Sequence, residues 1–366
     1  MIKIEAPGRI NLIGEHIDYN GGYVLPGCIN KRIKVSIFKH NKKYNSVHSK
    51  TLNEKFNFFI DEINKSSIHW HNYILGTVDY FLKKGFKISP FNLEISSNLP
   101  IGAGISSSSA LISAVAKALI KLFKFKLNKE DIIDSVSSVE KKYLGLNGGI
   151  MDQFTINYGK KNNLIFLNCL DKKHEFVEFD LNEHSLLLIN SNVKHSLLHS
   201  QYNERVIECN YVKSVLNNFH KNNKHLAEYT LNELEKIKEL INHKEYNRAK
   251  FVIEENQRTI NTFNLLREKK YDLIGDMIYK SHAGLRDLYD VSCNEIDFLV
   301  DQMMKNTNVL GSRMMGGGFG GSILNLVKGT LNQSVLEKLN NKYFKSFGKK
   351  ITPIKIKIVD GVREIK

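Results

Sequence analysis

The chain has 366 residues, of which 42% are hydrophobic and 25% are charged, and this composition excludes a wholly disordered protein. Its length favours two packed domains over a single core. No apolar run approaches the ~20 residues that a membrane-spanning helix needs, and no signal peptide is recognisable, so we expect no membrane association.

The formal net charge of +15 raises the question of a nucleic-acid partner. The lysines are spread along the chain among many asparagines, as in KSVLNNFHKNNKH at 213–225, and no nucleic-acid-binding motif accompanies them. We therefore interpret the charge as a solvated surface and expect no bound nucleic acid.

The cysteines are far apart and form no C-x-x-C pair: Cys28, Cys169, Cys209 and Cys293. This usage is typical of reduced, mostly buried thiols in a cytoplasmic protein. It argues against a zinc site.

Apolar periodicity predicts strands and helices in alternation over the first half of the chain. The expected elements are strands and hairpins within 1–40, a helix over 72–85, a strand over 91–100, helices over 108–123 and about 129–144, and a strand over 163–169.

The second half begins with a predicted strand over 184–193, followed by three or four long amphipathic helices from about 196 to 305. Strands over 322–328 and 351–361 then enclose one more helix. Strands followed by helices, twice over, predict two α+β domains, 1–175 and 176–366, and disfavour a repeated βαβ sheet.

The segment GRINLIGEHIDYNGG at 8–22 places Arg9, Glu15, His16 and Asp18 close together between glycines. A solvated loop could carry such charges, but the alternating apolar residues between them indicate a strand that delivers these groups to one place.

The segment LPIGAGISSSSALISAVAKAL at 99–119 has the order strand, Gly/Ser turn, helix. Glycines allow close approach to a ligand, and a helix N-terminus favours phosphate, while the serines can cap the helix or ligate magnesium. An ordinary capped helix is the alternative. No Walker A or protein-kinase motif is present.

Asp152 follows a Gly-Gly pair in YLGLNGGIMDQF at 143–154, where it can be a helix cap or an acceptor for a substrate hydroxyl. Glu140, upstream on the predicted helix, can complete a magnesium site or be an exposed carboxylate.

The glycines of GSRMMGGGFGGSIL at 311–324 form either a flexible hairpin or a loop pinned to a core.

In this order and spacing, the three glycine-rich segments resemble the motifs of the GHMP small-molecule kinase superfamily, named for galactokinase, homoserine kinase, mevalonate kinase and phosphomevalonate kinase. The first resembles the galactokinase signature, and NSNVKHSLLHSQYNERVIEC at 190–209 and HAGLRDLYDVSCNEIDFLV at 282–300 also resemble galactokinase segments. The resemblance implies a two-domain kinase fold with the active site in the cleft between the domains.

The resemblance implies a sugar pocket. Asp152 and Arg9 match the family's catalytic pair. The matching sugar-binding positions are Glu15, His16, Asp18, Gly149, Asp152 and Tyr202. The implied reaction is phosphoryl transfer from MgATP to the C1 hydroxyl of α-D-galactose, in galactose catabolism, with Asp152 either as a full base or as a group that positions the hydroxyl.

The resemblance also implies how ATP and Mg²⁺ are held. The residues expected around the phosphates are Gly102, Ala103, Gly104, Ile105, Ser106, Ser107 and Ser108. Ser108 and Glu140 are the expected magnesium ligands. Trp70 and Tyr73 are either neighbours of the adenine or part of the core.

Gly148 departs from the galactokinase pattern, which usually has cysteine before Gly149. A Gly-Gly pair resembles the related N-acetylgalactosamine kinases, so an N-acetylgalactosamine kinase or another galacto-sugar 1-kinase is the alternative. A non-catalytic galactose sensor is a further alternative, although the serine run and Asp152 are intact. We expect a monomer.

Overall fold

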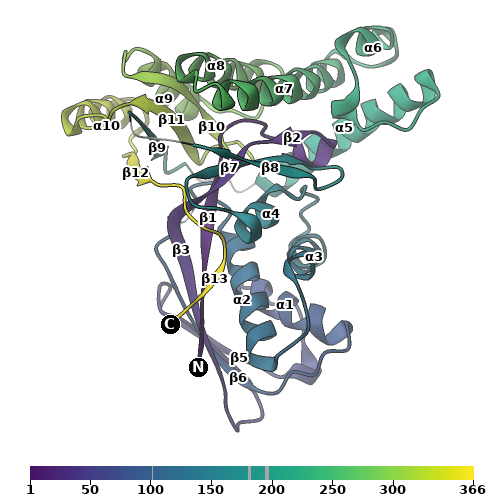
Figure 1. The fold of residues 1–366 in the computed structure, drawn as a ribbon, viewed down its shortest axis with the longest axis vertical. Coiled ribbons are helices and arrows are strands. Elements are labelled where there is room, and N and C mark those ends of the chain that lie inside the picture. Colours follow the sequence, from purple (N-terminus) through teal and green to yellow (C-terminus); the bar gives the residue numbers. More distant parts are fainter. Residues whose placement is uncertain (101, 180–182, 194–197) are drawn as a thin grey trace.

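The computed structural model describes residues 1–100, 102–179, 183–193 and 198–366 (Figure 1). The strands are β1 (Ile2–Asn11), β2 (Tyr23–Val24), β3 (Pro26–Lys39), β4 (Asn45–Ser49), β5 (Glu54–Phe58), β6 (Phe91–Ser97), β7 (Asn163–Asn168), β8 (His174–Glu178), β9 (His184–Asn190), β10 (Val309–Met315), β11 (Ser322–Lys328), β12 (Thr352–Ile356) and β13 (Arg363–Ile365).

The α-helices are α1 (His71–Lys83), α2 (Ser107–Phe123), α3 (Lys129–Val139), α4 (Met151–Tyr158), α5 (Leu198–His220), α6 (Leu231–Glu235), α7 (His243–Arg267), α8 (Tyr271–Asp287), α9 (Asn294–Met304) and α10 (Gln333–Phe347). A π-helical turn, Glu140–Leu144, directly follows α3.

Two sheets with their own helices make up most of the molecule. The first has strand order β13-β1-β3-β6-β4-β5, and α1 to α4 lie together on one side of it (Figure 1). The second has order β10-β11-β9-β12 and packs against α8 and α9. A small sheet, β2-β7-β8, lies where the two parts meet.

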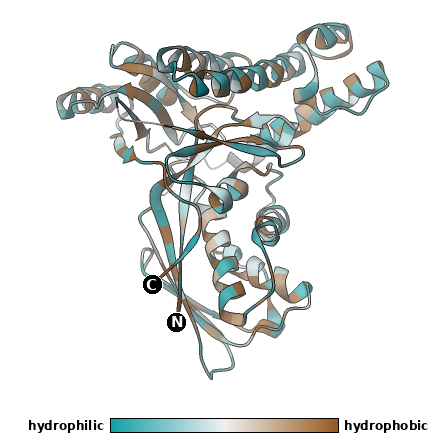
Figure 2. Ribbon diagram, viewed as in Figure 1, coloured by the Kyte–Doolittle hydropathy of each residue, from teal (hydrophilic) through white to brown (hydrophobic). Residues whose placement is uncertain are grey.

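The elements form where the local sequence favours them. β6 alternates buried and half-buried residues, as expected for a strand with one face on a core. α3 begins with a capping box in which the Asn128 side chain accepts from the backbone of Asp131, whose carboxylate accepts in return. In Figure 2, hydrophobic residues run along β9 and β11, whose side chains are buried on both faces.

The expected α+β architecture is confirmed, as are most of its elements. The predicted helix over 129–144 changes to a π turn at Glu140 and ends at Gly145, whose φ is +70°. β10 is not predicted from the sequence, because Gly311, Ser312 and Arg313 interrupt its apolar residues although all three are buried. Residues 194–197, at the start of the predicted helical region, lie outside the described residues.

The last strand of the chain returns to the first sheet. β13 pairs antiparallel with β1, and Ile365 lies opposite Lys3 in the register. Both termini therefore lie in the part of the molecule built from the first half of the sequence (Figure 1). A division of the chain near residue 175 stays a prediction, and we propose that β13 be assigned to the first domain.

Candidate active site

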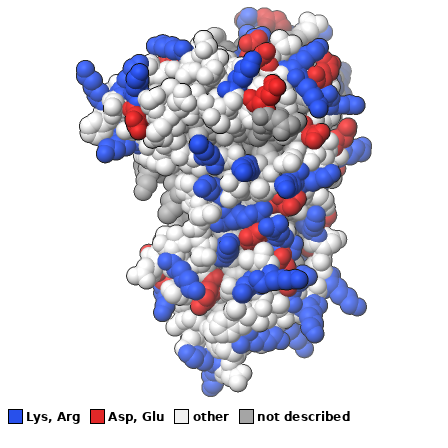
Figure 3. Space-filling model, turned by 60° about the vertical axis from the view of Figure 1, so that its left-hand side comes forward, with Lys and Arg blue, Asp and Glu red and all other residues white. Residues whose placement is uncertain are grey.

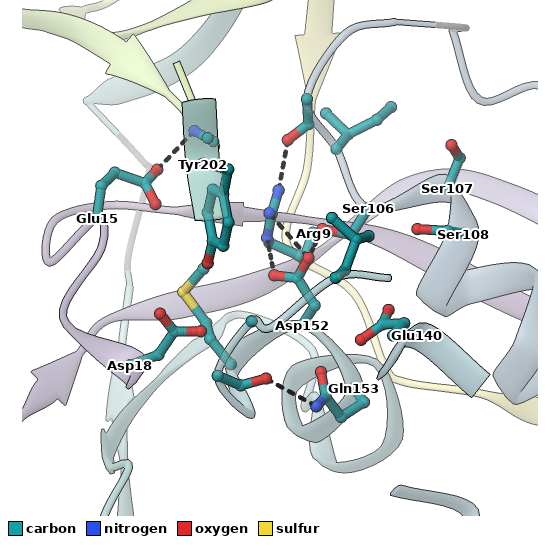
Figure 4. A pocket seen from close by; sticks show the side chains of 18 of the residues that line it. Arg9, Glu15, Asp18, Ser106, Ser107, Ser108, Glu140, Asp152, Gln153 and Tyr202 are labelled. Atoms are coloured by element: carbon teal, nitrogen blue, oxygen red, sulfur yellow. Dashed lines mark hydrogen bonds and ion pairs between the residues drawn. The ribbon is translucent and has the colours of Figure 1, made fainter. Parts of the chain in front are cut away.

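A pocket of about 280 Å³ lies where the signature segment, the Gly/Ser turn and the third glycine-rich segment meet (Figure 4). Every residue that the sequence analysis assigned to a site lines it: Arg9, Glu15, His16, Asp18, Gly102, Ala103, Gly104, Ile105, Ser106, Ser107, Ser108, Glu140, Gly149, Asp152 and Tyr202. The structure therefore brings together side chains that are up to 193 positions apart in the sequence, as from Arg9 to Tyr202 (202 − 9 = 193).

Arg9 and Asp152 form a bidentate ion pair in the middle of the pocket. The distances are 2.7 Å from Arg9 Nε to Asp152 Oδ1 and 3.1 Å from Nη2 to Oδ2. Asp152 is the second residue of α4, whose N-cap is Ile150, so the helix-cap alternative for Asp152 is wrong. Such fork-like pairing fixes both side chains in orientation as well as in distance.

The Gly/Ser turn contacts this ion pair directly. Arg9 Nη1 donates to the carbonyl of Gly104 at 2.5 Å, and Ser106 Oγ donates to Asp152 Oδ2. Ser106 is the N-cap of α2, but its side chain makes no capping hydrogen bond because the hydroxyl is directed to Asp152. Because Ser106 does not cap the helix, its side chain does not occupy the first N–H groups of α2. Such free N–H groups are what an anion site at a helix N-terminus requires.

The third glycine-rich segment is pinned to this turn. Ser322 Oγ donates to the Ala103 carbonyl at 2.8 Å, and a Cβ at Gly104 would lie 3.1 Å from the Met315 carbonyl oxygen. Gly316, with a φ of +88°, lines the pocket. The flexible-hairpin alternative for this segment is therefore wrong, and the backbones of two motifs meet at the pocket wall.

Glu15 links the signature to the third motif. Its Oε1 accepts from the backbone N–H of Gly316 at 2.8 Å and from Arg313 Nη2 at 3.1 Å, while Oε2 accepts from Asn11 at 3.3 Å. Arg313 is fully buried and also donates to the Leu12 carbonyl. A carboxylate has about four acceptor positions, so one position remains on Glu15 for a ligand hydroxyl.

His16 is a buried, neutral histidine. Burial, together with the nearby Arg205 cation, lowers its pKa to about 3. Its Nδ1 is hydrogen-bonded to the Tyr19 hydroxyl at 2.8 Å, and that hydroxyl bonds the hydroxyl of Tyr289 at 2.8 Å. Among the described residues no hydrogen bond to the buried Nε2 has ordinary geometry, although the Gly317 backbone interacts with the ring and opposes the lowering of its pKa.

Asp18 faces the pocket beside Gly149. A Cβ at position 149 would lie 2.4 Å from Asp18 Cγ, so only glycine fits there. Burial, together with the carboxylates of Asp152 and Glu15, raises the pKa of Asp18 to about 7. The Tyr202 ring lies 5.4 Å from the His16 ring and forms an adjacent wall of the pocket.

Glu140 carries the second perturbed carboxyl group. Burial raises its pKa to about 8, although Ser109 Oγ donates to its Oε1 at 2.5 Å and opposes that shift. Figure 4 shows Ser108 on the same side of the pocket as Glu140. A carboxylate and a hydroxyl suit Mg²⁺, which takes few protein ligands and completes its shell with phosphate and water, and a cation would offset the cost of ionising Glu140.

No group of three or more histidine, cysteine or acidic side chains that could hold a metal occurs among the described residues. Glu140 and Ser108 by themselves would supply two oxygen donors, and phosphate and water would have to complete a Mg²⁺ shell.

The sequence analysis did not assign a role to several residues that line the pocket: Pro100, Leu146, Gly148, Met151, Gln153, Gly316 and Gly317. Gln153 Nε2 donates to the Gly149 carbonyl at 2.9 Å and to Ser137. Its position one residue after Asp152 was the available signal. Arg313 had no signal, because a lone arginine in a strand is usually exposed.

Trp70 and Tyr73 do not line the pocket. Both are half-buried and pack against the core of the first part of the molecule. Trp70 also donates to Glu54 at 2.6 Å.

Among the described residues, no helix is long and apolar enough to cross a membrane, and all four cysteines are free thiols.

Three family models match the chain. GHMP kinases N terminal domain matches residues 72–160, GHMP kinases C terminal matches 263–345, and the galactokinase galactose-binding signature matches 2–38. These ranges contain the Gly/Ser turn with Asp152, the third glycine-rich segment, and the segment with Arg9, respectively. The fold is that of the GHMP kinases.

Comparison with individual proteins shows which branch of the GHMP kinases the chain resembles. Galactokinases of Thermotoga neapolitana and Thermotoga maritima are 39% and 40% identical, with 100% of each chain covered. The structure of Lactococcus lactis galactokinase complexed with galactose is 30% identical, with a TM-score of 0.94 over 100% of this chain and 95% of that one. The chain belongs to the galactokinase family. A mevalonate kinase structure, 20% identical with a TM-score of 0.67, shares the fold.

Proposed function

We propose that the protein transfers the γ-phosphoryl group of ATP to the C1 hydroxyl of α-D-galactose, giving galactose 1-phosphate and ADP. The observation that carries this proposal is the Arg9–Asp152 ion pair, which lies between the signature residues and the open N-terminus of α2. The same pocket thus contains a carboxylate that can accept a substrate hydroxyl and a helix N-terminus that can bind phosphate.

Asp152 receives the C1 hydroxyl. Its oxygens accept from Arg9 twice and from Ser106 once, so about one acceptor position remains for a substrate proton. This fixed carboxylate orients the hydroxyl toward the phosphorus and takes its proton as the new O–P bond forms.

Arg9 stabilises negative charge on the transferring group. Burial alone lowers the pKa of Arg9, but the carboxylates of Asp152 and Glu15 outweigh this effect and raise it overall. The guanidinium therefore stays cationic at every physiological pH. A fixed cation beside the reacting oxygens stabilises the transition state without reorganisation of the site.

The ATP phosphates lie against the Gly/Ser turn, where the backbone N–H groups at the start of α2 and the hydroxyls of Ser107 and Ser108 can donate to them. Mg²⁺, when bound, neutralises charge on the phosphates. Ser108 and Glu140 would hold it, as their oxygen donors suit this ion.

The sugar occupies the side of the pocket lined by the signature. Glu15, His16 and Asp18 bind the sugar hydroxyls, since all three line the pocket beside Asp152 and buried polar groups need hydrogen-bond partners. Gly149 approaches the sugar through its backbone, and Tyr202 forms a wall of the same pocket.

N-acetylgalactosamine is a second candidate substrate because of Gly148. A Cβ there would meet only the Tyr202 hydroxyl, at 3.6 Å, so the glycine leaves open space next to the sugar side of the pocket. This space can accept a larger group on the sugar.

We also propose that the protein is a cytoplasmic monomer that binds no nucleic acid. In Figure 3, Lys and Arg are spread over the visible face and interspersed with Asp and Glu, which supports the interpretation of the charge as a solvated surface. Size-exclusion chromatography with light scattering tests the monomer, and a mass near 84 kDa (2 × 42.0 kDa) would contradict it.

ADP release by the purified protein with MgATP tests the proposed reaction, with galactose, N-acetylgalactosamine, glucose and galacturonate assayed separately. Turnover with galactose supports the proposal, and turnover that favours N-acetylgalactosamine moves the assignment to the second candidate. Absence of turnover, with sugar-dependent thermal stabilisation, would instead indicate a sensor. The exposed pair of Asp171 and Lys173 provides the matched control, Asp171→Asn, for Asp152→Asn.

A further inference from the structure

A buried carboxylate outside the pocket binds the backbone of the signature segment. Glu255, on α7, is fully buried. Its Oε1 accepts from the backbone N–H of Gly14 at 3.1 Å and from Ser281 Oγ at 2.5 Å. Its Oε2 accepts from Arg258 Nε at 2.8 Å.

Burial of a carboxylate is costly unless a cation and hydrogen-bond donors surround it. Arg258 supplies the cation, and Ser281 and Gly14 supply the donors. Gly14 is the partner that connects this charge to the pocket, because the next residue, Glu15, lines the pocket. The interaction thus joins a helix of the second half of the chain to the sugar side of the site.

The chain turns sharply at this contact. Gly14 has a φ of +100°, and a Cβ there would lie 2.8 Å from the Tyr23 carbonyl oxygen and 3.0 Å from Thr259 Oγ1. Thr259 lies one helical turn after Glu255 on α7. The helix surface therefore packs directly against the turn, and Glu255 accepts a hydrogen bond from the Gly14 backbone N–H.

The neighbouring residue of α7 holds the other end of the same segment. Asn256 Oδ1 accepts from the Tyr23 backbone N–H at 2.9 Å, and its Nδ2 donates to the Ala227 carbonyl at 2.9 Å. A Cβ at Gly22 would lie 2.5 Å from Asn256 Oδ1. Two consecutive side chains thus fix both ends of 14–23, the segment that carries His16 and Asp18.

We infer that Glu255 is a positioning residue for sugar recognition: it acts through the Gly14 N–H to hold the signature segment in its sugar-binding arrangement. This inference rests on the proposed function. Two properties of the Glu255 side chain matter for this role. Its length lets the carboxylate reach the Gly14 N–H, and its negative charge pairs with Arg258.

Two variants separate these properties. Glu255→Asp keeps the charge but shortens the side chain by one methylene, which withdraws it from Gly14. Glu255→Gln keeps the length and can still offer an oxygen to Gly14, but it loses the charge beside Arg258. Glu254→Asp is the matched control, since Glu254 pairs only with Lys250 and Arg258 among the contacts of the described residues.

We expect Glu255→Asp to raise the KM for galactose about tenfold, the cost of one hydrogen bond to a charged group, and to leave the KM for ATP within about twofold. Glu255→Gln should raise the galactose KM much less, and Glu254→Asp should change neither value. Equal rises in both KM values, or a larger galactose effect in Glu255→Gln than in Glu255→Asp, would overturn the inference. So would an unchanged galactose KM in both Glu255 variants.

Hydrogen–deuterium exchange of the ligand-free protein gives a readout that needs no activity. Amides within 14–23 should exchange faster in Glu255→Asp than in the unsubstituted protein and Glu254→Asp, while those of β6 stay unchanged. Unchanged exchange in 14–23 would overturn the inference. An unsubstituted protein that fails to phosphorylate galactose would overturn the proposed function, and the exchange result would still decide whether Glu255 holds the segment.

Discussion

Gly149 and Asp18 are in direct contact: a Cβ at position 149 would lie 2.4 Å from both Cγ and Oδ2 of the aspartate. The contact joins the segment before α4 to the signature, so the position of the Asp18 carboxylate depends on a glycine 131 residues away (149 − 18 = 131).

Gly149→Ala should displace Asp18 and lower kcat/KM for galactose by about 100-fold, the scale expected for a misplacement of about 1 Å in an active site. Steady-state kinetics measure this effect. Gly148→Ala adds the same methyl group where the nearest atom is 3.6 Å away, so its effect should be much smaller. Equal effects of the two substitutions would contradict the role of the contact.

Asp18 should make galactose use depend on pH. Because burial raises its pKa to about 7, the carboxylate that accepts sugar hydroxyls forms only as the pH rises through that value. We expect kcat/KM for galactose, at saturating MgATP, to fall with decreasing pH below 7. In Asp18→Asn the remaining activity should lose this limb of the pH profile, and a limb that persists there would assign the dependence to another group.

The raised pKa of Asp18 also affects the stability of the fold, but here low pH is favourable. A carboxyl group whose folded-state pKa is raised from 3.8 to about 7 favours the folded state at low pH, and this contribution is lost as the pH rises through 7. Asp18→Asn cannot ionise, so its Tm should exceed that of the unsubstituted protein at pH 8 and approach it near pH 4. Differential scanning fluorimetry without ligand measures this difference; a lower Tm for the variant at pH 8 contradicts it.

The hydroxyl of Tyr289 should support sugar binding although it does not line the pocket. It bonds the Tyr19 hydroxyl, which orients His16, and it also contacts Cys209 Sγ at 3.2 Å. Tyr289→Phe should cost about 1 kcal/mol of stability and raise the galactose KM several-fold. Tyr343→Phe, which removes an equally buried hydroxyl bonded to the Ser191 carbonyl, should cost similar stability without a change in that KM.

Glu140 should determine the magnesium requirement. Glu140→Gln keeps the shape of the side chain but removes the charge that would offset a divalent cation, so the Mg²⁺ concentration for half-maximal activity should rise at least about tenfold. Titration of Mg²⁺ at fixed ATP measures it. Glu130→Gln on α3, where the carboxylate bonds Tyr158 and Lys172, is the control and should leave the Mg²⁺ titration unchanged.

The polar residues of the pocket could be predicted from the sequence because they stand in motifs where charged residues and glycines cluster. An ordinary turn does not require such clusters. Asp152 and Ser106 stood in such motifs, and the structure brings them into contact. The residues that hold those motifs in place were not predictable in this way. Glu255 is one of several acidic residues on an amphipathic helix, and its burial depends on Arg258, Ser281 and Gly14, which only the folded chain brings together.

The fold was predictable to a similar extent. Helices such as α2, with a continuous Ala- and Leu-rich run, were visible from apolar spacing, whereas β10 and β13 were not. β10 shows no apolar run because Gly311, Ser312 and Arg313 stand in its middle, and the three-residue β13 owes its structure to pairing with β1 at the opposite end of the chain. Such strands take their structure from their neighbours.

The most direct test of the central claim is the position of the phosphate in the product. ³¹P and ¹H NMR of a reaction of the purified protein with MgATP and galactose should show one sugar phosphate, whose phosphorus couples to the anomeric proton of the α-sugar. The Asp152→Asn variant, folded to the same Tm, should form none, while Asp171→Asn should form it as the unsubstituted protein does. A phosphate on another carbon, or ADP formed without any sugar phosphate, would contradict the account.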